Sequence, residues 1–245
     1  MLIHQTKEKL IQMKMAGICK GLEEQQNSPS YQDMSFEQRL GLLVDKEFQL
    51  RENRRHTKRL REAKLRLNAQ VEDVDYQAPR GLDKSFYLEL AAGNWIQGRH
   101  NLIINGPTGC GKTFLACALA NKSIRDGLRC MYYHFPELLS ELAIKKAEGS
   151  FQTMLKNLDR RELLIIDDWL REEVTADQAK NILDLFEKRF RTKSVLLTTQ
   201  IPVSDWHERF KDPTLADAIL DRIVHDSYRI NLQGDSMRKR TAKLT

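Results

Sequence analysis

Residues 106–113 have the types and the spacing of a loop that binds a polyphosphate. They read Gly-Pro-Thr-Gly-Cys-Gly-Lys-Thr and match the pattern G-x-x-x-x-G-K-[ST]. In such a loop the glycines let successive backbone N–H groups point inward. These groups and the N-terminus of the next helix attract phosphate oxygens. We therefore expect ATP to contact Gly106, Pro107, Thr108, Gly109, Cys110, Gly111, Lys112 and Thr113.

Two side chains of this loop and two later carboxylates could carry the reaction chemistry. Lys112 can reach the β- and γ-phosphates, and the Thr113 hydroxyl can bind Mg²⁺. The apolar run of residues 163–166 leads into Asp167 and Asp168, which is typical of a buried strand that brings acids to the sheet edge beside the loop. Asp167 can then hold Mg²⁺, and Asp168 can orient or deprotonate an attacking water.

A third polar position follows another buried strand. Residues 195–200 read Val-Leu-Leu-Thr-Thr-Gln, and a side chain at this end of the strand could contact the γ-phosphate or the attacking water. We assign this role to Gln200, with Thr199 as the alternative.

The elements that must position these residues follow from the hydrophobic pattern. A strand-like apolar run precedes the loop, and an apolar helical run of residues 114–120 follows it. Strands alternate with helices through the rest of the chain, which predicts an α/β fold with a five-stranded parallel sheet covered on both faces. The strands are expected near residues 101–105, 129–134, 163–167, 194–199 and 227–231.

The pattern predicts three parts in the chain. Residues 1–67 read as a small all-helical domain, in which Ser35 and Gln38 form a capping box at the start of a long helix. Apolar residues at helical spacing predict that the first half of this helix is buried. Residues 68–82 have the composition of a linker, and residues 83–245 form the nucleotide-binding domain.

Length and composition exclude several classes of protein. The chain has 245 residues, of which 41% are hydrophobic, enough for a sizeable core. No apolar run approaches the ~18 residues of a membrane span, and the charged N-terminus lacks a signal-peptide pattern. We therefore expect a cytoplasmic protein with no membrane partner. The four cysteines lack C-x-x-C spacing, which predicts reduced, small hydrophobic residues.

The net charge of +6 is concentrated in one short segment. Residues 51–66 contain eight basic and two acidic residues, so the segment carries +6 (8 − 2) and the rest is neutral (32 basic, 32 acidic). Such a cluster predicts an anionic polymer as partner. No base-reading module is visible, so contacts with the DNA backbone are expected. The candidates in this segment are Arg51, Arg54, Arg55, Lys58, Arg59 and Arg61.

Several stretches together resemble the IstB family, the transposition helper ATPases of bacterial insertion sequences. The most specific is Thr-Thr-Gln-Ile-Pro-Val-Ser-Asp-Trp-His-Glu-Arg at residues 198–209. The resemblance covers nearly the whole chain and also involves residues 35–43, 51–66, 106–113, 163–168, 212–214, 216–222 and 234–240.

The resemblance implies an AAA+ ATPase close to bacterial helicase loaders and replication initiators. Such a protein takes ATP and Mg²⁺, assembles with its own copies into a ring or spiral on duplex DNA, and contacts a cognate transposase. By position, Lys112 and Thr113 serve the phosphates and the metal, Asp167 serves Mg²⁺, Asp168 serves the water, and Gln200 takes the first sensor position.

Two arginines receive a role only through the resemblance. From the residues alone, Arg222 is a surface arginine paired with Asp221 or Asp226. The resemblance implies instead an arginine finger that reaches the nucleotide of a neighbouring subunit. It also implies a second-sensor role for Arg238, although we expect the C-terminal lid of larger AAA+ proteins to be reduced or absent.

A helical region between the second and third strands carries two further candidates. Residues 137–161 read as two short helices broken at Gly149, and the resemblance places this region along the channel of the assembly. Lys145 and Lys146 could contact DNA phosphates there, with a solvated helical face as the alternative.

One position departs from the usual AAA+ pattern, which has Asp-Glu where this chain has Asp167-Asp168. The shorter carboxylate predicts hydrolysis that is slow or confined to the assembled state. Two other functions share the same ATPase core: a replicative helicase loader, and a scaffold that ATP closes without being hydrolysed. A small-molecule kinase is a more distant alternative, because it has no obvious use for the basic segment. Residues 76–82 are the candidate segment for contact with adenine.

Overall fold

The computed structural model describes residues 2–234 and residue 237, and a five-stranded sheet forms its centre. The strand order is β2-β3-β4-β1-β5, and every neighbouring pair is parallel. The five strands predicted from the sequence are confirmed. They are β1 (Asn101–Asn105), β2 (Cys130–His134), β3 (Leu163–Asp167), β4 (Ser194–Thr199) and β5 (Ser227–Asn231).

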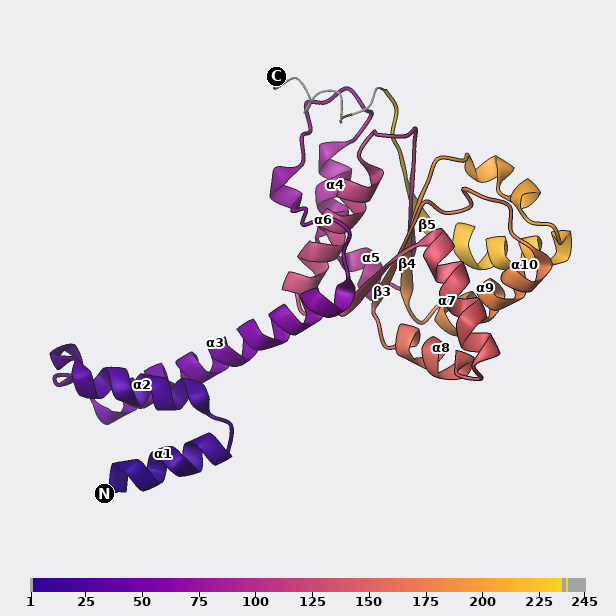
Figure 1. Ribbon diagram of the computed structural model, residues 1–245. Helices are drawn as coiled ribbons and strands as arrows, with labels where there is room; N and C mark the ends of the chain where they lie inside the picture. Colours follow the sequence, from indigo (N-terminus) through magenta and orange to yellow (C-terminus); the bar gives the residue numbers. More distant parts are fainter. Residues whose placement is uncertain (1, 235–236, 238–245) are drawn as a thin grey trace, which may run out of the picture. The chain divides into compact units, whose positions relative to one another are not determined.

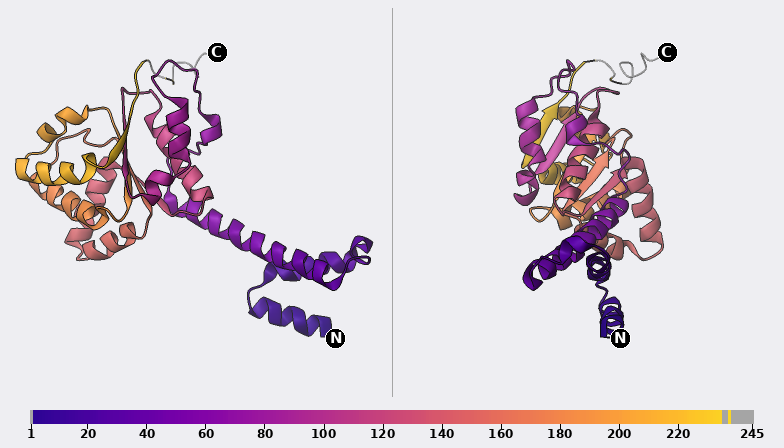
Figure 2. Two further views of the ribbon diagram at one scale, coloured as in Figure 1. Left: turned by 180° about the vertical axis from the view of Figure 1, so that it is seen from behind. Right: turned by 90° about the vertical axis from the view of Figure 1, so that its left-hand side faces the viewer.

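Helices cover both faces of this sheet, as predicted. They are α4 (Lys84–Ala91), α5 (Asn94–Gln97), α6 (Lys112–Arg125), α7 (Phe135–Ala147), α8 (Phe151–Asp159), α9 (Ala176–Arg189) and α10 (Pro213–Val224). Alternate side chains of β1 face opposite cores: Leu102 and Ile104 pack with α4 and α6, and Ile103 packs with α7 to α10. Figure 1 shows the two helical layers, and the views in Figure 2 separate them again.

The parallel register brings several strand ends to one edge of the sheet. Asp167 at the end of β3 lies beside His134 at the end of β2. Thr199 at the end of β4 lies beside Asn105 at the end of β1. Because ligands of open α/β sheets bind outside the carboxyl ends of the strands, this edge is where a site is expected.

Residues 68–82 pack against the sheet domain more closely than a linker would. Ala69, Val71, Val74 and Ala78 are buried, and three of them join the core formed by α4 and α6. The acidic residues between them, Glu72, Asp73 and Asp75, are exposed, so the segment has a buried side that its polar composition hides. It contains one short 3-10 helix, η2 (Val71–Asp73), and two others lie later, η3 (Val203–Asp205) and η4 (His207–Arg209).

By its internal contacts the chain divides into two compact units, Met1–Lys58 and Arg59–Thr245. The predicted division at residues 67 and 82 stays a prediction. The first unit holds α1 (Leu2–Gln12), α2 (Ala16–Asn27), the 3-10 helix η1 (Pro29–Tyr31) and most of α3 (Phe36–Ala63).

The predicted capping box opens α3. The Ser35 N–H donates to Gln38 Oε1 at 2.9 Å, and the Gln38 N–H donates to Ser35 Oγ at 3.3 Å. Two unpaired donors at the start of the helix are thereby satisfied.

Small residues bring α2 close to α3 in the first unit. A Cβ on Gly17 would lie 2.6 Å from the Glu47 Cα, and one on Gly21 would lie 2.6 Å from Leu43 Cδ2. The Glu47 side chain is buried, and its Oε2 accepts the N–H of Gly17 at 2.6 Å and that of Ile18 at 3.3 Å. Glu47 therefore acts as an anion at the N-terminal turn of α2.

The predicted burial of the first half of α3 is wrong for most of its apolar residues. Leu43 is buried against α2, but Phe36, Leu40, Val44 and Phe48 are 65%, 45%, 52% and 64% exposed. Helical periodicity shows that a helix has an apolar side and leaves open what covers it.

The four cysteines are free and buried. Burial raises the pKa of Cys117 to about 11 and that of Cys130 to about 12. Within the described residues, no helix is long and apolar enough to cross a membrane.

Acid should weaken the first unit through Glu47. Burial raises the pKa of Glu47, but hydrogen bonds from Arg51, Gly17 and Ile18 outweigh it and leave this pKa below its ordinary value. Because the folded-state pKa is depressed, the stabilisation is present above the unfolded pKa of about 4.3 and is lost as pH falls through the folded value.

We expect Glu47→Gln to lower the thermal midpoint of the first unit at pH 7 and to change it less and less as the pH falls and Glu47 becomes protonated in the folded state as well. Circular dichroism at 222 nm would follow the helices, with the partly exposed Glu52→Gln as control. An equal loss at both pH values would contradict the role of the ionised Glu47.

Candidate functional site

The phosphate-loop residues 106–111 connect β1 to α6, the context expected for this motif. Gly109 and Gly111 have φ angles of 85° and 95°, which glycine adopts without strain. Gly111 is the N-cap of α6, so the first N–H groups of the helix open toward the loop. The loop can therefore cradle an anion.

Lys112 is held inside the loop by backbone carbonyls. Its Nζ donates to the Gly106 oxygen at 2.8 Å and to the Pro107 oxygen at 2.9 Å. Burial lowers the pKa of Lys112 from its ordinary value. Phosphate oxygens would be stronger partners for this ammonium than the two carbonyls, since the hydrogen bonds would be charge-assisted on both sides.

Arg80 supports the loop from behind, and the sequence did not indicate it. Arg80 is 3% exposed. Its Nη1 donates to the backbone oxygen of Cys110 at 3.1 Å, and its Nη2 donates to the backbone oxygen of Asp75 at 3.0 Å. A Cβ on Gly111 would lie 2.5 Å from Nη1, so the loop needs glycine at this position for a second reason.

Asp167 is fully buried and surrounded by donors. The Thr113 hydroxyl lies 3.0 and 2.9 Å from its two carboxylate oxygens, and the Tyr132 hydroxyl donates to Oδ2 at 2.7 Å. The Thr198 hydroxyl donates to Oδ1, and Arg66 Nη1 lies 3.6 Å from Oδ2. A charge buried this deeply is tolerated because it is hydrogen-bonded and paired.

The residues present fit a magnesium ion that a nucleotide completes. Magnesium prefers one or two carboxylates together with hydroxyl, water and phosphate oxygens, and Thr113 and Asp167 supply adjacent oxygens beside the phosphate loop. Among the described residues no group of three or more histidines, cysteines or acids could hold a metal. Phosphate and water oxygens would provide the other ligands.

The side chain of Asp168 turns away from Asp167 and lies near His134 and Gln200. Its backbone has φ of 58°, a left-handed conformation that aspartate tolerates better than most residues. Its N–H donates to the Thr198 hydroxyl at 3.1 Å. The carboxylate lies 3.3 Å from His134 Nε2 and accepts from Gln200 Nε2 at 3.4 Å.

Gln200, rather than Thr199, reaches toward the phosphate loop. Its Oε1 accepts from the Thr108 hydroxyl at 2.5 Å. The Thr199 hydroxyl is buried and donates to the Trp169 oxygen at 3.0 Å, on the side away from the loop. The sensor role assigned to Gln200 stays a prediction.

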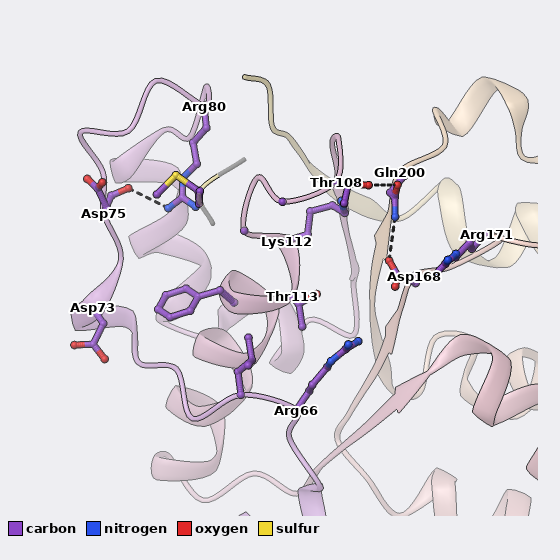
Figure 3. Close-up of a pocket in the computed structure, with 15 residues that line it drawn as sticks. Arg66, Asp73, Asp75, Arg80, Thr108, Lys112, Thr113, Asp168, Arg171 and Gln200 are labelled. Carbon is purple, nitrogen blue, oxygen red and sulfur yellow. Dashed lines mark hydrogen bonds between the residues drawn. The ribbon is translucent and has the colours of Figure 1, made fainter. Parts of the chain in front are cut away.

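A cavity of about 830 Å³ lies between these groups (Figure 3). Its volume is within the range of about 300–1,000 Å³ that is usual for small-molecule sites. Of residues 76–82, the candidate adenine segment, Arg80 alone is on its wall. The wall includes Thr108, Gly109, Gly111, Lys112, Thr113, Asp168 and Gln200 from the predicted set, and Arg66, Asp75, Arg80, Phe114, Arg171 and Met237 besides.

Arg222 lies apart from this cavity, in a separate pocket with Arg99 and Phe190. Its Nη2 contacts Glu187 Oε1 at 3.0 Å, and its Nη1 donates to the Ala218 oxygen. The pairing expected with Asp221 or Asp226 is therefore corrected to Glu187, which comes from α9. Asp221 lies 3.4 Å from His225 instead.

The other predicted contacts have mixed surroundings. Lys145 pairs with Glu148 at 2.8 Å, and Lys146 Nζ donates to Asn181 Oδ1 at 2.7 Å. Their role toward DNA stays a prediction. Arg238, the suggested second sensor, lies outside the described residues.

The basic segment of α3 keeps most of its charges at the surface. Arg51 and Arg55 are exposed but pair with Glu47 and Glu52, each at 2.6 Å. Arg59 is half-buried, and the remaining exposed members are Arg54, Lys58 and Arg61.

Sequence reasoning missed Arg66, Tyr132, His134 and Thr198, and the structure brings all four to the two aspartates. Tyr132 and His134 end a strand with polar groups, the same signal that pointed to Gln200. That signal could have found them. Arg66 was counted with the basic segment, and nothing in its spacing sets it apart.

Comparison with known sequences agrees with the motifs. A family model described as IstB-like ATP binding protein matches residues 8–245. The chain is 41% identical over 239 residues to y4pL of Sinorhizobium fredii, whose name calls it an insertion sequence ATP-binding protein, with 98% of each chain covered. It is 29% identical over 236 residues to an ATP-binding protein named for insertion sequence IS21 in Pseudomonas aeruginosa, covering 96% of this chain and 89% of the relative.

Solved structures share the fold at low identity. The DnaC helicase loader aligns with a TM-score of 0.54 and 21% identity, covering 69% of this chain and 99% of that one. AMPPCP-bound DnaA from Aquifex aeolicus aligns with a TM-score of 0.59 and 16% identity, covering 73% of this chain and 54% of that one. These alignments show that the chain shares the α/β fold of these proteins.

Replacing Lys112 tests the phosphate loop. We expect Lys112→Ala to weaken binding of a fluorescent ATP analogue by about 10²-fold, because two charge-assisted hydrogen bonds to phosphate would be lost. Fluorescence anisotropy would measure the affinity, with Lys122→Ala on α6 as control, since Lys122 pairs with Asp126 outside the cavity. Equal affinities of Lys112→Ala and the unchanged protein would exclude this loop as the nucleotide site.

Proposed function

Because this chain belongs to the family of IstB-like ATP-binding proteins, we propose that it is an ATPase that assembles on duplex DNA and recruits or regulates a transposase in insertion-sequence transposition. The observation that supports this most is the cavity where the phosphate loop, Asp168 and Gln200 meet. The proposed contacts between this protein and DNA do not depend on the base sequence of the DNA. ATP and DNA as ligands suit a cytoplasmic protein.

Hydrolysis would use the phosphate loop together with the aspartates and the glutamine at the strand ends. The loop N–H groups and Lys112 hold the β- and γ-phosphates, and Thr113 and Asp167 would hold Mg²⁺, which neutralises phosphate charge when bound. Asp168 accepts the proton of the attacking water, and Gln200 orients that water. The proximity of Asp168 to Gln200 supports this division of roles.

Two features support hydrolysis that depends on assembly. Asp168 is shorter than the usual glutamate, and His134 and Gln200 hold it from both sides. Arg222 lies in a pocket separate from the cavity of its own chain, so it could act as an arginine finger only on the nucleotide of a neighbouring copy.

The contact with DNA is assigned to the basic segment of α3. Exposed arginines and lysines on a helix, without a base-reading motif, suit the phosphate backbone. The exposed apolar residues Phe36, Leu40, Val44 and Phe48 support a protein contact by the first unit, either with another copy or with the transposase.

A helicase loader is the second candidate, and the fold likeness to DnaC favours it. The two functions differ in their preferred DNA, since a loader is expected to prefer single strands. A scaffold that ATP closes without hydrolysis is the third candidate and differs in turnover.

DNA binding gives the first test of the proposal. With ATP, we expect tighter binding to duplex than to single-stranded DNA, and a slope of log affinity against log salt near about −5 if roughly six phosphates are neutralised. Arg54→Glu with Lys58→Glu should weaken binding and flatten the slope, whereas Lys180→Glu with Lys211→Glu serves as control. Preference for single strands would favour a loader, and affinity independent of salt would exclude backbone binding.

Asp168→Asn gives the second test, because an amide cannot take the proton of the water. We expect ATP turnover on duplex DNA to fall by about 10²-fold or more, with affinity for the ATP analogue nearly unchanged. Phosphate release would be measured beside Asp184→Asn, an exposed aspartate of α9. If DNA loading and release persist unchanged in Asp168→Asn, the scaffold function replaces this one.

A further inference from the structure

Arg66 brings a positive charge to the carboxylate that would hold the metal. Its Nη1 lies 3.6 Å from Oδ2 of Asp167, and Asp167 is fully buried whereas the Arg66 side chain is 52% exposed. Arg66 also lines the cavity with Lys112 and Thr113. Figure 3 shows its guanidinium pointing toward Thr113 and the Asp168 side. A surface arginine thus reaches into the cavity from its rim.

The charge balance around Asp167 gives this contact a purpose. A buried carboxylate needs a positive partner, because an unpaired charge is costly at low dielectric. Lys112 does not fill this place, since its ammonium is held by the carbonyls of Gly106 and Pro107. Among the residues that the structure describes, Arg66 is the cation that pairs with Asp167.

A magnesium ion and the Arg66 guanidinium cannot share Asp167 without cost. Magnesium binds its ligands at about 2.0–2.1 Å and carries two charges, so a guanidinium held against the same carboxylate would be repelled. The half-exposed Arg66 side chain has room to leave, whereas Asp167 is fixed by Thr198 and Tyr132.

We propose that Arg66 is the resident counter-ion of Asp167, that a magnesium-bound nucleotide displaces it, and that its release is passed to the end of α3. This inference rests on the proposed nucleotide site. The occupant of the carboxylate then reports whether the cavity holds a metal–nucleotide complex.

The route to α3 is short and well anchored. Arg66 follows Ala63, the last residue of α3, after a turn through Lys64, whose φ of 52° is left-handed. Ala63 is fully buried in the sheet core, and Glu62 pairs with Arg161 at 2.8 Å. A displacement of Arg66 is therefore expected to act on the tight turn at Lys64, which connects Arg66 directly to α3.

A magnesium titration tests the exchange directly. A fluorescent ATP analogue would be bound at increasing Mg²⁺, from EDTA upward, by the full chain and by its variants, without DNA. We expect Arg66→Ala to lower the Mg²⁺ concentration at half-maximal binding of the analogue by about tenfold, which is within the usual range for two coupled sites. In EDTA, Arg66→Ala should weaken binding of the analogue at least about fivefold. Arg66→Lys, which keeps the charge, should stay near the unchanged protein.

Arg171→Ala is the matched control, because Arg171 is an exposed arginine on the same cavity wall. It should weaken binding similarly with and without Mg²⁺ and leave the midpoint unchanged. A midpoint in Arg66→Ala equal to that in Arg171→Ala would overturn the counter-ion role. If the unchanged protein binds no analogue even with Mg²⁺, the proposed nucleotide site itself fails.

Hydrogen exchange tests the passage to α3. Addition of Mg²⁺ and the ATP analogue should increase exchange at residues 62–67 in the unchanged protein and in Arg171→Ala. In Arg66→Ala these residues should exchange fast both before and after the addition. If exchange at residues 62–67 of the unchanged protein is the same with and without Mg²⁺ and the analogue, the proposed passage from Arg66 to α3 is overturned.

Discussion

The buried carboxylate of Asp167 is the constraint on which the site depends. Its partners come from four separate segments: Thr113 from α6, Tyr132 from β2, Thr198 from β4 and Arg66 from the segment after α3. A charge enclosed in this way is tolerated only while all these segments keep their register. The parallel alignment of β2, β3 and β4 is therefore tied to the chemistry at their ends.

The neighbouring Asp168 owes its position to an unusual backbone. Its φ is 58°, that of Leu170 is 56°, and the intervening Trp169 N–H donates to the Thr198 oxygen at 2.8 Å. The chain thus turns away from β3 at once, which sends one carboxylate into the sheet and the next into the cavity. Aspartate suits a left-handed position better than a longer side chain does. An aspartate at this position is therefore compatible with the turn, and its side chain is one methylene shorter than that of a glutamate.

The sequence predicted β1, β3 and β4 well because each contains a continuous apolar run, which is typical of a buried parallel strand. It predicted the phosphate loop because glycine spacing and a following helix are local features. It could not predict Arg66 or Arg80, since their roles depend on contacts with residues far along the chain: Asp167 for Arg66, and Cys110 for Arg80. It was wrong about the apolar side of α3, because periodicity carries no information about the surface that covers a helix. The predicted boundaries at residues 67 and 82 stay predictions.

The charge count of residues 51–66 also changes meaning in the structure. Taken as a sum, the segment offers +6 to a polyanion, but Arg51 and Arg55 pair with Glu47 and Glu52, and Arg66 pairs with Asp167. Arg54, Lys58 and Arg61 recur at spacings of four and three residues, which places them on one side of α3. A single row along a helix can follow one sugar–phosphate strand, which suits backbone contact without base reading. The same helix ends three residues before Arg66, so the row that would meet DNA and the arginine that meets Asp167 belong to one continuous segment.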